Sequence, residues 1–434
     1  MTVGVLERNA VEVEQRRAWF ARILVGLITI ATFGPYVYGG IRTEQVVIYL
    51  VGFLTIPALG QMRPRGGLRF LIAWVLYVLV AMVSVVFPSV AVAPRDPGNF
   101  LAGLDNVATP LLILLIVWTW VPEKVAPSAV DLFTRLLSVA MAANGILAII
   151  ATRFDISALL RPFWSASTVA TTTADLSESM GRYGGIFNQP AEAGIAYSLA
   201  GIAAIYAWKH RPALLALILV PITIGGLICV SKVFVLGGLP VIIVYWMIAQ
   251  TGGRRIATLF ALVLVGLGVL QSGLLGQWTG FNYLARLINP DGDGGALAFY
   301  SAGRLAQDST YNTVIGDALG YSPVVGVGVG GWAVPYDGAI PEALVVGGVI
   351  GLALYVAVVV GIFTLTRRGA SKDIRLFALF FAIVVAGSSF GISPLTANRD
   401  STIIWMLIAL LVLARRATEA PATSPAEAVP VHAR

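Results

Sequence analysis

The sequence carries little charge for its length. Of its 434 residues, 12% are charged and 58% are hydrophobic, whereas a soluble domain has about 25% charged residues. This composition excludes a water-soluble globular protein and indicates a chain with many membrane-spanning segments. The net charge of +7 is therefore interpreted as a mark of cytoplasmic loops, and not as a sign of nucleic-acid binding.

Cysteine and histidine are nearly absent. The single cysteine, Cys229, cannot form an intrachain disulfide, and the two histidines are His210 and His432. His210 follows a predicted cytoplasmic span end and His432 lies in the tail, so a histidine base or a histidine-rich metal site is excluded from the opposite face. Neither G-x-x-x-x-G-K-[ST] nor H-E-x-x-H occurs. No cofactor and no metal are expected.

Long apolar runs are what the sequence has in abundance. They are about long enough to be membrane helices, although the second run is short, and they predict an all-α bundle of about twelve transmembrane helices. The runs cover residues 18–37, 45–60, 68–88, 100–121, 128–152, 189–208, 212–230, 233–249, 255–274, 341–366, 374–392 and 399–415.

The basic residues alternate with these runs. With Arg8, Arg16 and Arg17 in the cytoplasm, every second connection is short and basic, as the positive-inside rule requires. The basic residues on the cytoplasmic side are then Arg63, Arg65 and Arg69; Lys124 and Arg135; Lys209 and Arg211; Arg254 and Arg255; Arg367, Arg368, Lys372 and Arg375; and Arg415 and Arg416. A miscounted span would invert this pattern, so both termini are predicted to be cytoplasmic.

Three parts of the chain follow from this topology. They are a cytoplasmic N-terminus (1–17), a transmembrane domain (18–415) and a disordered cytoplasmic tail (416–434) rich in Ala and Pro. The opposite face has two long loops, at about 153–188 and 271–341, and loops of that length are usually functional or disordered. In the second loop, the spacing predicts a short helix from Arg304 to Leu319 that Pro323 ends.

Basic residues on the outer face need a reason, because the positive-inside rule disfavours them there. Arginine's planar fork suits bidentate binding of phosphate oxygens. The outer set is Arg42, Arg95, Arg153, Arg161, Arg182, Lys232, Arg286, Arg304 and Arg399. Each also has a structural interpretation: Arg182 pairing with Glu178, Arg304 with Asp308, Arg42 with Glu44, Arg399 with Asp400, and Lys232 or the others anchoring a span end.

Arg182 stands in the stretch that organises the chain, "GRYGGIFNQPAEAG" at 181–194. Its glycines favour close backbone approach to a bulky group, and the stretch leads directly into an apolar helix. Among the acids, Asp337 and Glu342 precede or begin the tenth run. A buried carboxylate there suits a general base, and the alternative is a helix-start acid favoured by the dipole. Glu192 is interpreted as a first-turn helix acid of that latter kind.

Several segments together resemble the bacterial O-antigen polymerase and ligase superfamily. They are "RYGGIFNQPAEAG" at 182–194, "SKVFVLGGLPVII" at 231–243, Gly303-Arg304, "SPVVGVGVGGW" at 322–332 and "PEALVVGGVIGLALYV" at 341–356. The chain departs from the family pattern at Asn188-Gln189-Pro190-Ala191. It also lacks the histidine that the ligase branch has before the tenth-span motif.

The resemblance implies metal-independent glycosyl transfer on the outer face of the bacterial cytoplasmic membrane. The substrate would be an undecaprenyl diphosphate-linked oligosaccharide, and the protein partners a chain-length regulator or a flippase. On this hypothesis Arg182, Arg304 and Lys232 bind the diphosphate, and Asp337 or Glu342 acts on the acceptor hydroxyl. The substrate loops contain Gly184, Gly185, Asn188, Gly326 and Gly328.

Three alternatives remain open from the sequence. One is ligase-type transfer of a glycan to a different acceptor. Another is a transporter of an anionic lipid or solute, which predicts broken helices and charges near the membrane midplane. The third is a non-catalytic membrane assembly factor.

Overall fold

The computed structural model describes residues 2–38, 40–62, 67–87, 98–165, 171–250, 252–271, 278–281, 284, 309–332, 336, 338–367 and 371–417. Arg304, Asp337 and the tail from residue 418 onward lie outside the described residues. What the sequence indicates for them stays a prediction.

The described residues form a nearly all-α bundle with one short antiparallel hairpin. The N-terminal elements are α1 (Thr2–Thr32), β1 (Tyr36–Tyr38), β2 (Ile41–Arg42), α2 (Thr43–Thr55), η1 (Ile56–Gln61), α3 (Leu68–Val86), α4 (Phe100–Trp120), η3 (Glu123–Val125), α5 (Ala126–Ala151), α6 (Ser157–Trp164) and α7 (Thr173–Ser179). The C-terminal elements are α8 (Pro190–Trp208), α9 (Pro212–Ile228), the π-helix η4 (Val233–Gly238), α10 (Leu239–Ala249), α11 (Gly253–Gln271), α14 (Thr310–Tyr321), α15 (Ala339–Phe363), η5 (Thr364–Thr366), α16 (Lys372–Ser388) and α17 (Asn398–Ala417).

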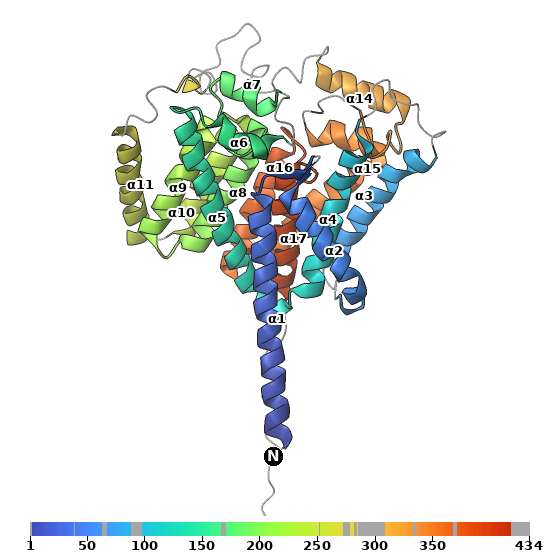
Figure 1. The fold of residues 1–434 in the computed structure, drawn as a ribbon, viewed down its shortest axis with the longest axis horizontal. Helices are drawn as coiled ribbons and strands as arrows, with labels where there is room; N and C mark the ends of the chain where they lie inside the picture. The colour runs from blue at the N-terminus through green and yellow to red at the C-terminus, as the bar shows by residue number, and fades with distance from the viewer. Residues whose placement is uncertain are drawn as a thin grey trace, which may run out of the picture.

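Helices cover most of each of the twelve predicted apolar runs, of which one extends beyond the described residues at 272–274. Among the described residues, five helical stretches are long and apolar enough to cross a membrane: Thr43–Gly60, Leu68–Val86, Phe100–Trp120, Glu123–Ala151 and Ala339–Thr366. The chain therefore has membrane-helix character, and the full number of twelve spans stays a prediction. The largest difference from the predicted boundaries is α1, which begins at Thr2 and projects well beyond the bundle (Figure 1).

Two helices form the centre of the bundle. The buried residues of α8 run from Glu192 to Ile205, and those of α17 from Arg399 to Ala414, on all sides of each helix. A helix that is buried all round must be enclosed by other elements. In Figure 1, α17 lies between a group containing α5 and α8–α11 and a group containing α2–α4, α14 and α15.

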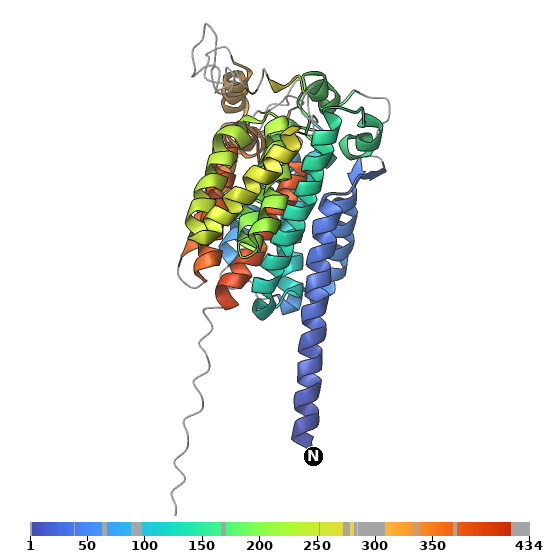
Figure 2. The same ribbon diagram turned by 90° about the vertical axis from the view of Figure 1, so that its left-hand side faces the viewer.

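The basic connections lie at one end of the bundle. They are the ones that the charge pattern predicts to be cytoplasmic. Lys124 pairs with Glu14 at 3.1 Å, and Arg416 pairs with Glu123 at 2.7 Å. Lys209 pairs with Asp373 at 2.5 Å. This end carries the N-terminus, and α6, α7 and α14 lie at the opposite end (Figures 1 and 2).

The long loops at that opposite end contain short helices. In the first loop, α7 begins with a reciprocal capping box between Thr172 and Asp175. Backbone hydrogen bonding from Thr172 also lowers the pKa of the Asp175 carboxyl.

The predicted helix of the second loop corresponds to α14. Its first turn is capped by Ser309, whose Oγ accepts from Asn312 N at 3.2 Å, and it ends at Tyr321, before Pro323 as predicted. Val314 and Ala318 are buried against α15. Leu319, in the same helix, is exposed.

Candidate functional site

Arg182 lies against the turn that carries Lys232. Its Nη2 donates to the carbonyl oxygen of Val230 at 3.3 Å, and Tyr183 N donates to Ile228 O at 3.3 Å. Arg182 and Lys232 are both partly buried. Two of the three predicted diphosphate-binding residues thus belong to neighbouring segments, although 50 positions separate them in the sequence.

The Lys232 turn has an unusual backbone. Val230 has a φ of +47°, which is an outlier for a β-branched residue and costs of order 1–3 kcal/mol. The π-helix η4 begins directly after Lys232, and π-helical turns are frequent at functional sites. A Cβ on Gly194 of α8 would collide with Ser231 Oγ, so the turn also packs tightly on α8.

Gly184 and Gly185 face the protein interior. Gly185 has a φ of +65°, and a Cβ there would clash with the side-chain amide of Asn144 in α5. Asn144 Nδ2 donates to Gly184 O at 3.2 Å, and Asn144 Oδ1 accepts from Ile186 N at 2.8 Å. These contacts fix the path of the Arg182 stretch over α5. The close approach predicted for the glycines is therefore made to Asn144, a residue that the sequence did not single out.

Asn188 also has a local structural partner. Its Oδ1 accepts from Ala174 N at 3.1 Å, in the first turn of α7. This contact ties the start of α8 to the short helix that lies above it. The side chain is half-buried.

Gly326 lies in the loop before α15 and packs against a break in that helix. The helix is interrupted at Gly348, where φ is +61° and ψ is −158°. Val327 N donates to Val345 O at 2.7 Å, and Val349 N donates to Pro323 O at 2.8 Å. The glycine-rich loop therefore satisfies backbone groups that the break would otherwise leave without partners. A Cβ on Gly326 would lie 2.6 Å from Val345 O, so only glycine fits.

Gly328 continues this close packing on the other side of the loop. Its φ is +98°, and a Cβ would lie 3.2 Å from Ala81 O in α3. The next residue, Val329, donates its N–H to the same Ala81 carbonyl at 2.9 Å. The loop is thus held between α3 and α15.

Glu342 is held by the loop that joins α16 to α17 (residues 389–397). Thr396 Oγ1 donates to Glu342 Oε1 at 2.5 Å, and Ala339 N donates to Ser389 O at 3.0 Å. A Cβ on Gly391 would lie 2.9 Å from Cγ2 of Val233. The α16–α17 loop therefore contacts both the beginning of α15 and the π-helix that follows Lys232.

The same region of the chain holds a second carboxylate. Asn398 Nδ2 donates to Glu192 Oε1 at 2.7 Å. Asn398 has a φ of +33°, another left-handed non-glycine residue at this place. Glu192 lies in the first turn of α8, as the sequence indicated. It is also buried, with 4% exposure, and accepts a hydrogen bond from another segment.

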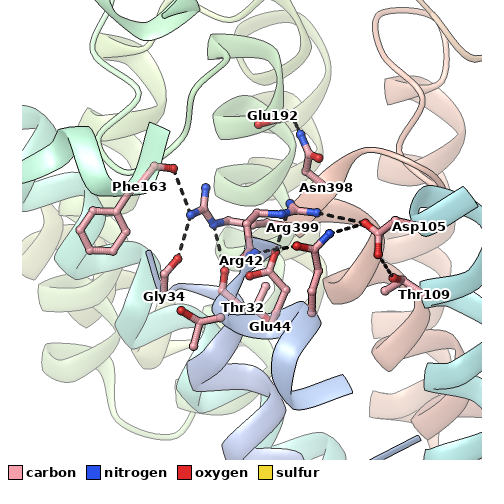
Figure 3. Close-up of polar contacts among 12 residues, drawn as sticks. Thr32, Gly34, Arg42, Glu44, Asp105, Thr109, Phe163, Glu192, Asn398 and Arg399 are labelled. Atoms are coloured by element: carbon pink, nitrogen blue, oxygen red, sulfur yellow. Dashed lines mark hydrogen bonds and ion pairs between the residues drawn. The ribbon is translucent and has the colours of Figure 1, made fainter. Parts of the chain in front are cut away.

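A buried charge cluster lies beside Glu192 (Figure 3). Arg42 pairs with Glu44 at 3.0 Å, as one sequence interpretation expected, and Arg42 also lies 3.8 Å from Asp105. The side chains of Arg42 and Glu44 are 6% and 1% exposed. Buried pairs of this kind cost several kcal/mol per ion in desolvation.

Arg399 does not form the expected pair with Asp400. Its guanidinium instead donates to four backbone carbonyls, which are those of Thr32, Gly34, Phe163 and Ile186, at 2.9–3.2 Å. These carbonyls lie at or just after the end of α1, in the last turn of α6 and within the Arg182 stretch. Because a guanidinium has five N–H donors in a fixed fork, a single side chain can join these separate segments to α17 (Figure 3).

A cleft of about 300 Å³ opens next to Tyr183 at the end of α5. It is lined by Arg153, Asp155 and Glu178 among others. Burial, together with the charges of Asp155 and Asp175, raises the pKa of the Glu178 carboxyl to about 7. The cleft is thus a polar hollow beside the Arg182 stretch, with one carboxyl that titrates near neutral pH.

Searches against protein-family models and curated proteins find no match to this chain. The functional interpretation therefore depends on the residues themselves.

Proposed function

We propose that this chain polymerises lipid-linked oligosaccharides by glycosyl transfer at the outer face of the bacterial cytoplasmic membrane. In this proposal the chain crosses the membrane twelve times, with both termini in the cytoplasm. The substrate is an undecaprenyl diphosphate-linked repeat unit. The resemblance of the ordered motifs to O-antigen polymerases and ligases is the starting point.

One observation carries the proposal. The α16–α17 loop reaches both Glu342, through Thr396, and Val233, the neighbour of Lys232. Arg182 contacts the same Lys232 turn through Val230 O. Predicted phosphate-binding residues and a predicted base therefore belong to segments that pack on one another, although they are distant in the sequence.

The chemistry assigned to these residues is a displacement at the anomeric carbon. The acceptor hydroxyl oxygen forms a bond to that carbon while the bond to the diphosphate oxygen breaks. Arg182, Lys232 and Arg304 stabilise the negative charge on the leaving undecaprenyl diphosphate. Glu342, or Asp337, accepts the proton of the acceptor hydroxyl.

The first test is substitution of the proposed phosphate-binding arginines. Arg182→Lys and Arg304→Lys should shorten or abolish the surface polymer, because lysine keeps the charge but cannot bind two oxygens with a planar fork. Arg161→Lys is the matched control, since Arg161 pairs with Asp175 on the same face at 3.1 Å. Polymer of normal length in both variants would reject the assignment.

Transport of an anionic lipid or solute is the second candidate. It is favoured by the break of α15 at Gly348 and by the buried charges beside Glu192, because broken helices and buried charges are features of transporters. Movement of a lipid-linked substrate across vesicles without any lengthening of the glycan would support it. Ligase-type transfer would instead appear as a single transfer to a different acceptor.

A further inference from the structure

The buried charge cluster contains more acidic groups than basic ones. Arg42 faces Glu44 and Asp105, while Arg399 acts on Glu192 and Asp400. In each half, one guanidinium serves two carboxyl groups. If every group were ionised, each half would therefore carry an excess negative charge.

The half around Arg42 has other means of stabilising its acids. Asp105 accepts hydrogen bonds from Tyr49 at 2.7 Å, from Thr109 at 3.1 Å and from Gln45. Its side chain is 16% exposed, so water contributes as well. Glu44 is in direct ion-pair contact with Arg42.

The half around Arg399 has no such compensation for Asp400. Glu192 accepts a hydrogen bond from Asn398. The N–H groups of the Arg399 guanidinium donate to backbone carbonyls. Asp400 is 0% exposed, and among the described residues neither of its carboxylate oxygens has a hydrogen-bond partner. Its N-terminal place in α17 supplies no capping bond, because neither oxygen accepts from a helix N–H.

An uncompensated carboxylate in this position is very costly. Removing an isolated charge from water costs many kcal/mol, and ionisable groups inside a membrane domain are usually partnered. The Asp400 carboxyl lies on α17 with the Glu192 carboxyl of α8 acting on it electrostatically, and the two helices pack together. The missing partner must therefore be positively charged and small.

We infer that Glu192 and Asp400 form a binding site for a monovalent cation, which is a proton or a sodium ion. One such cation restores the charge balance of two carboxyl groups beside one guanidinium. The site is independent of the glycosyl-transfer proposal, and it fits a polymerase and a transporter equally well.

Other charged groups also face the site from the packed elements. They are Arg399 on α17 itself, Arg42 at the end of β2, Glu44 at the start of α2, and Asp105 on α4. Any effect of pH or sodium on stability includes their contributions. The test must therefore compare variants that differ only at Asp400.

The test uses the full chain purified in detergent, with its unfolding temperature measured in two series. One series varies pH in sodium-free choline buffers, and the other varies sodium chloride against choline chloride at constant ionic strength. The wild type is compared with Asp400→Asn and with Asp373→Asn, a control whose side chain is 58% exposed at the opposite end. Ligand that binds only the folded state raises the unfolding temperature.

A sodium site predicts that sodium raises the wild-type unfolding temperature and that Asp400→Asn loses this shift. A proton site predicts no sodium shift and a wild-type unfolding temperature that falls as pH rises, with this fall reduced in Asp400→Asn. Asp373→Asn should respond as the wild type does. If Asp400→Asn fails to fold, Glu192→Gln takes its place. Identical responses of wild type and variant in both series would overturn the inference.

Discussion

The two ends of the bundle handle their charges in opposite ways. At the end that carries the N-terminus, the Lys124–Glu14 ion pair is open to solvent, since its side chains are 83% and 59% exposed. At the other end, Arg42 and Glu44 are 6% and 1% exposed, and Arg399 is 3% exposed. The charge pattern of the sequence distinguishes these two ends, but it does not show that one set is buried.

The exposed charges follow the predicted membrane topology, and the buried charges contribute to the stability of the fold. Exposed pairs contribute about 0–1 kcal/mol, because solvent and salt screen them. Breaking a buried pair costs about 3–5 kcal/mol, because the remaining group is left buried without its partner. The exposed end therefore tolerates change, and the buried end should not. Three substitution experiments examine this contrast, from the largest expected effect to the smallest.

The largest effect is expected for Arg399→Ala. It removes the donor to four backbone carbonyls that join α1, α6 and the Arg182 stretch to α17. The loss should reach about 3–5 kcal/mol, measured as the free energy of unfolding in a denaturing-detergent titration. Lys124→Ala at the exposed end is the control and should cost less than about 1 kcal/mol. Equal losses for the two variants would remove the contrast between the ends.

A smaller loss is expected for Gly185→Ala. Gly185 has a φ of +65°, and a Cβ there would displace the Asn144 amide from its hydrogen bonds. Backbone strain and the lost hydrogen bonds together predict about 3 kcal/mol. Gly252→Ala is matched to it, because Gly252 has a φ of +54° at the exposed end and nothing lies within 4 Å of its added Cβ.

Gly252→Ala should therefore show the strain alone, about 1–2 kcal/mol. The difference between the two variants isolates the contact with Asn144. If both lose the same stability by unfolding titration, Asn144 does not hold the Arg182 stretch.

The smallest effect is a pH dependence at Glu178. Its pKa is raised from 4.5 to about 7 in the folded protein, so the folded state binds this proton more tightly than the unfolded state. Its contribution to stability is complete below pH 4.5 and is lost as pH rises through about 7. Glu178→Gln should weaken the dependence of the unfolding temperature on pH over this interval, relative to wild type. An unchanged pH profile would contradict the buried setting of the carboxyl.

The sequence predicted the helices well and the site only partly. Apolar runs of span length leave few structural alternatives, which is why helices cover most of each run. Glu342, Arg182 and Lys232 became candidate site residues because charge is conspicuous in apolar sequence, and the packing of the Arg182 and Lys232 segments was not predicted. Asn144, Thr396 and Asn398 were missed, because an isolated polar residue in or beside a helix carries no pattern that reveals its partner.

The sequence also did not reveal which groups the glycines approach. Their spacing indicated close approach of the backbone to another group, and the structure has close approaches at Gly185 and Gly326. The approaching groups are Asn144 and the broken part of α15, which lie far away in the sequence. Similarly, Arg399 has an acid as its chain neighbour but bonds to carbonyls of other segments. Only the tertiary fold determines such partners.

The most direct test of the proposed function is reconstitution of the purified chain in vesicles with an undecaprenyl diphosphate-linked repeat unit. The reaction is followed by the length of the lipid-linked glycan, with and without EDTA, for wild type, Glu342→Gln and Arg161→Lys. We expect glycans of several repeat units with wild type and Arg161→Lys in both conditions, and a strong reduction with Glu342→Gln. Vesicles in which the wild-type protein moves the substrate across the membrane, or leaves it unchanged, without extending the glycan would contradict the proposal.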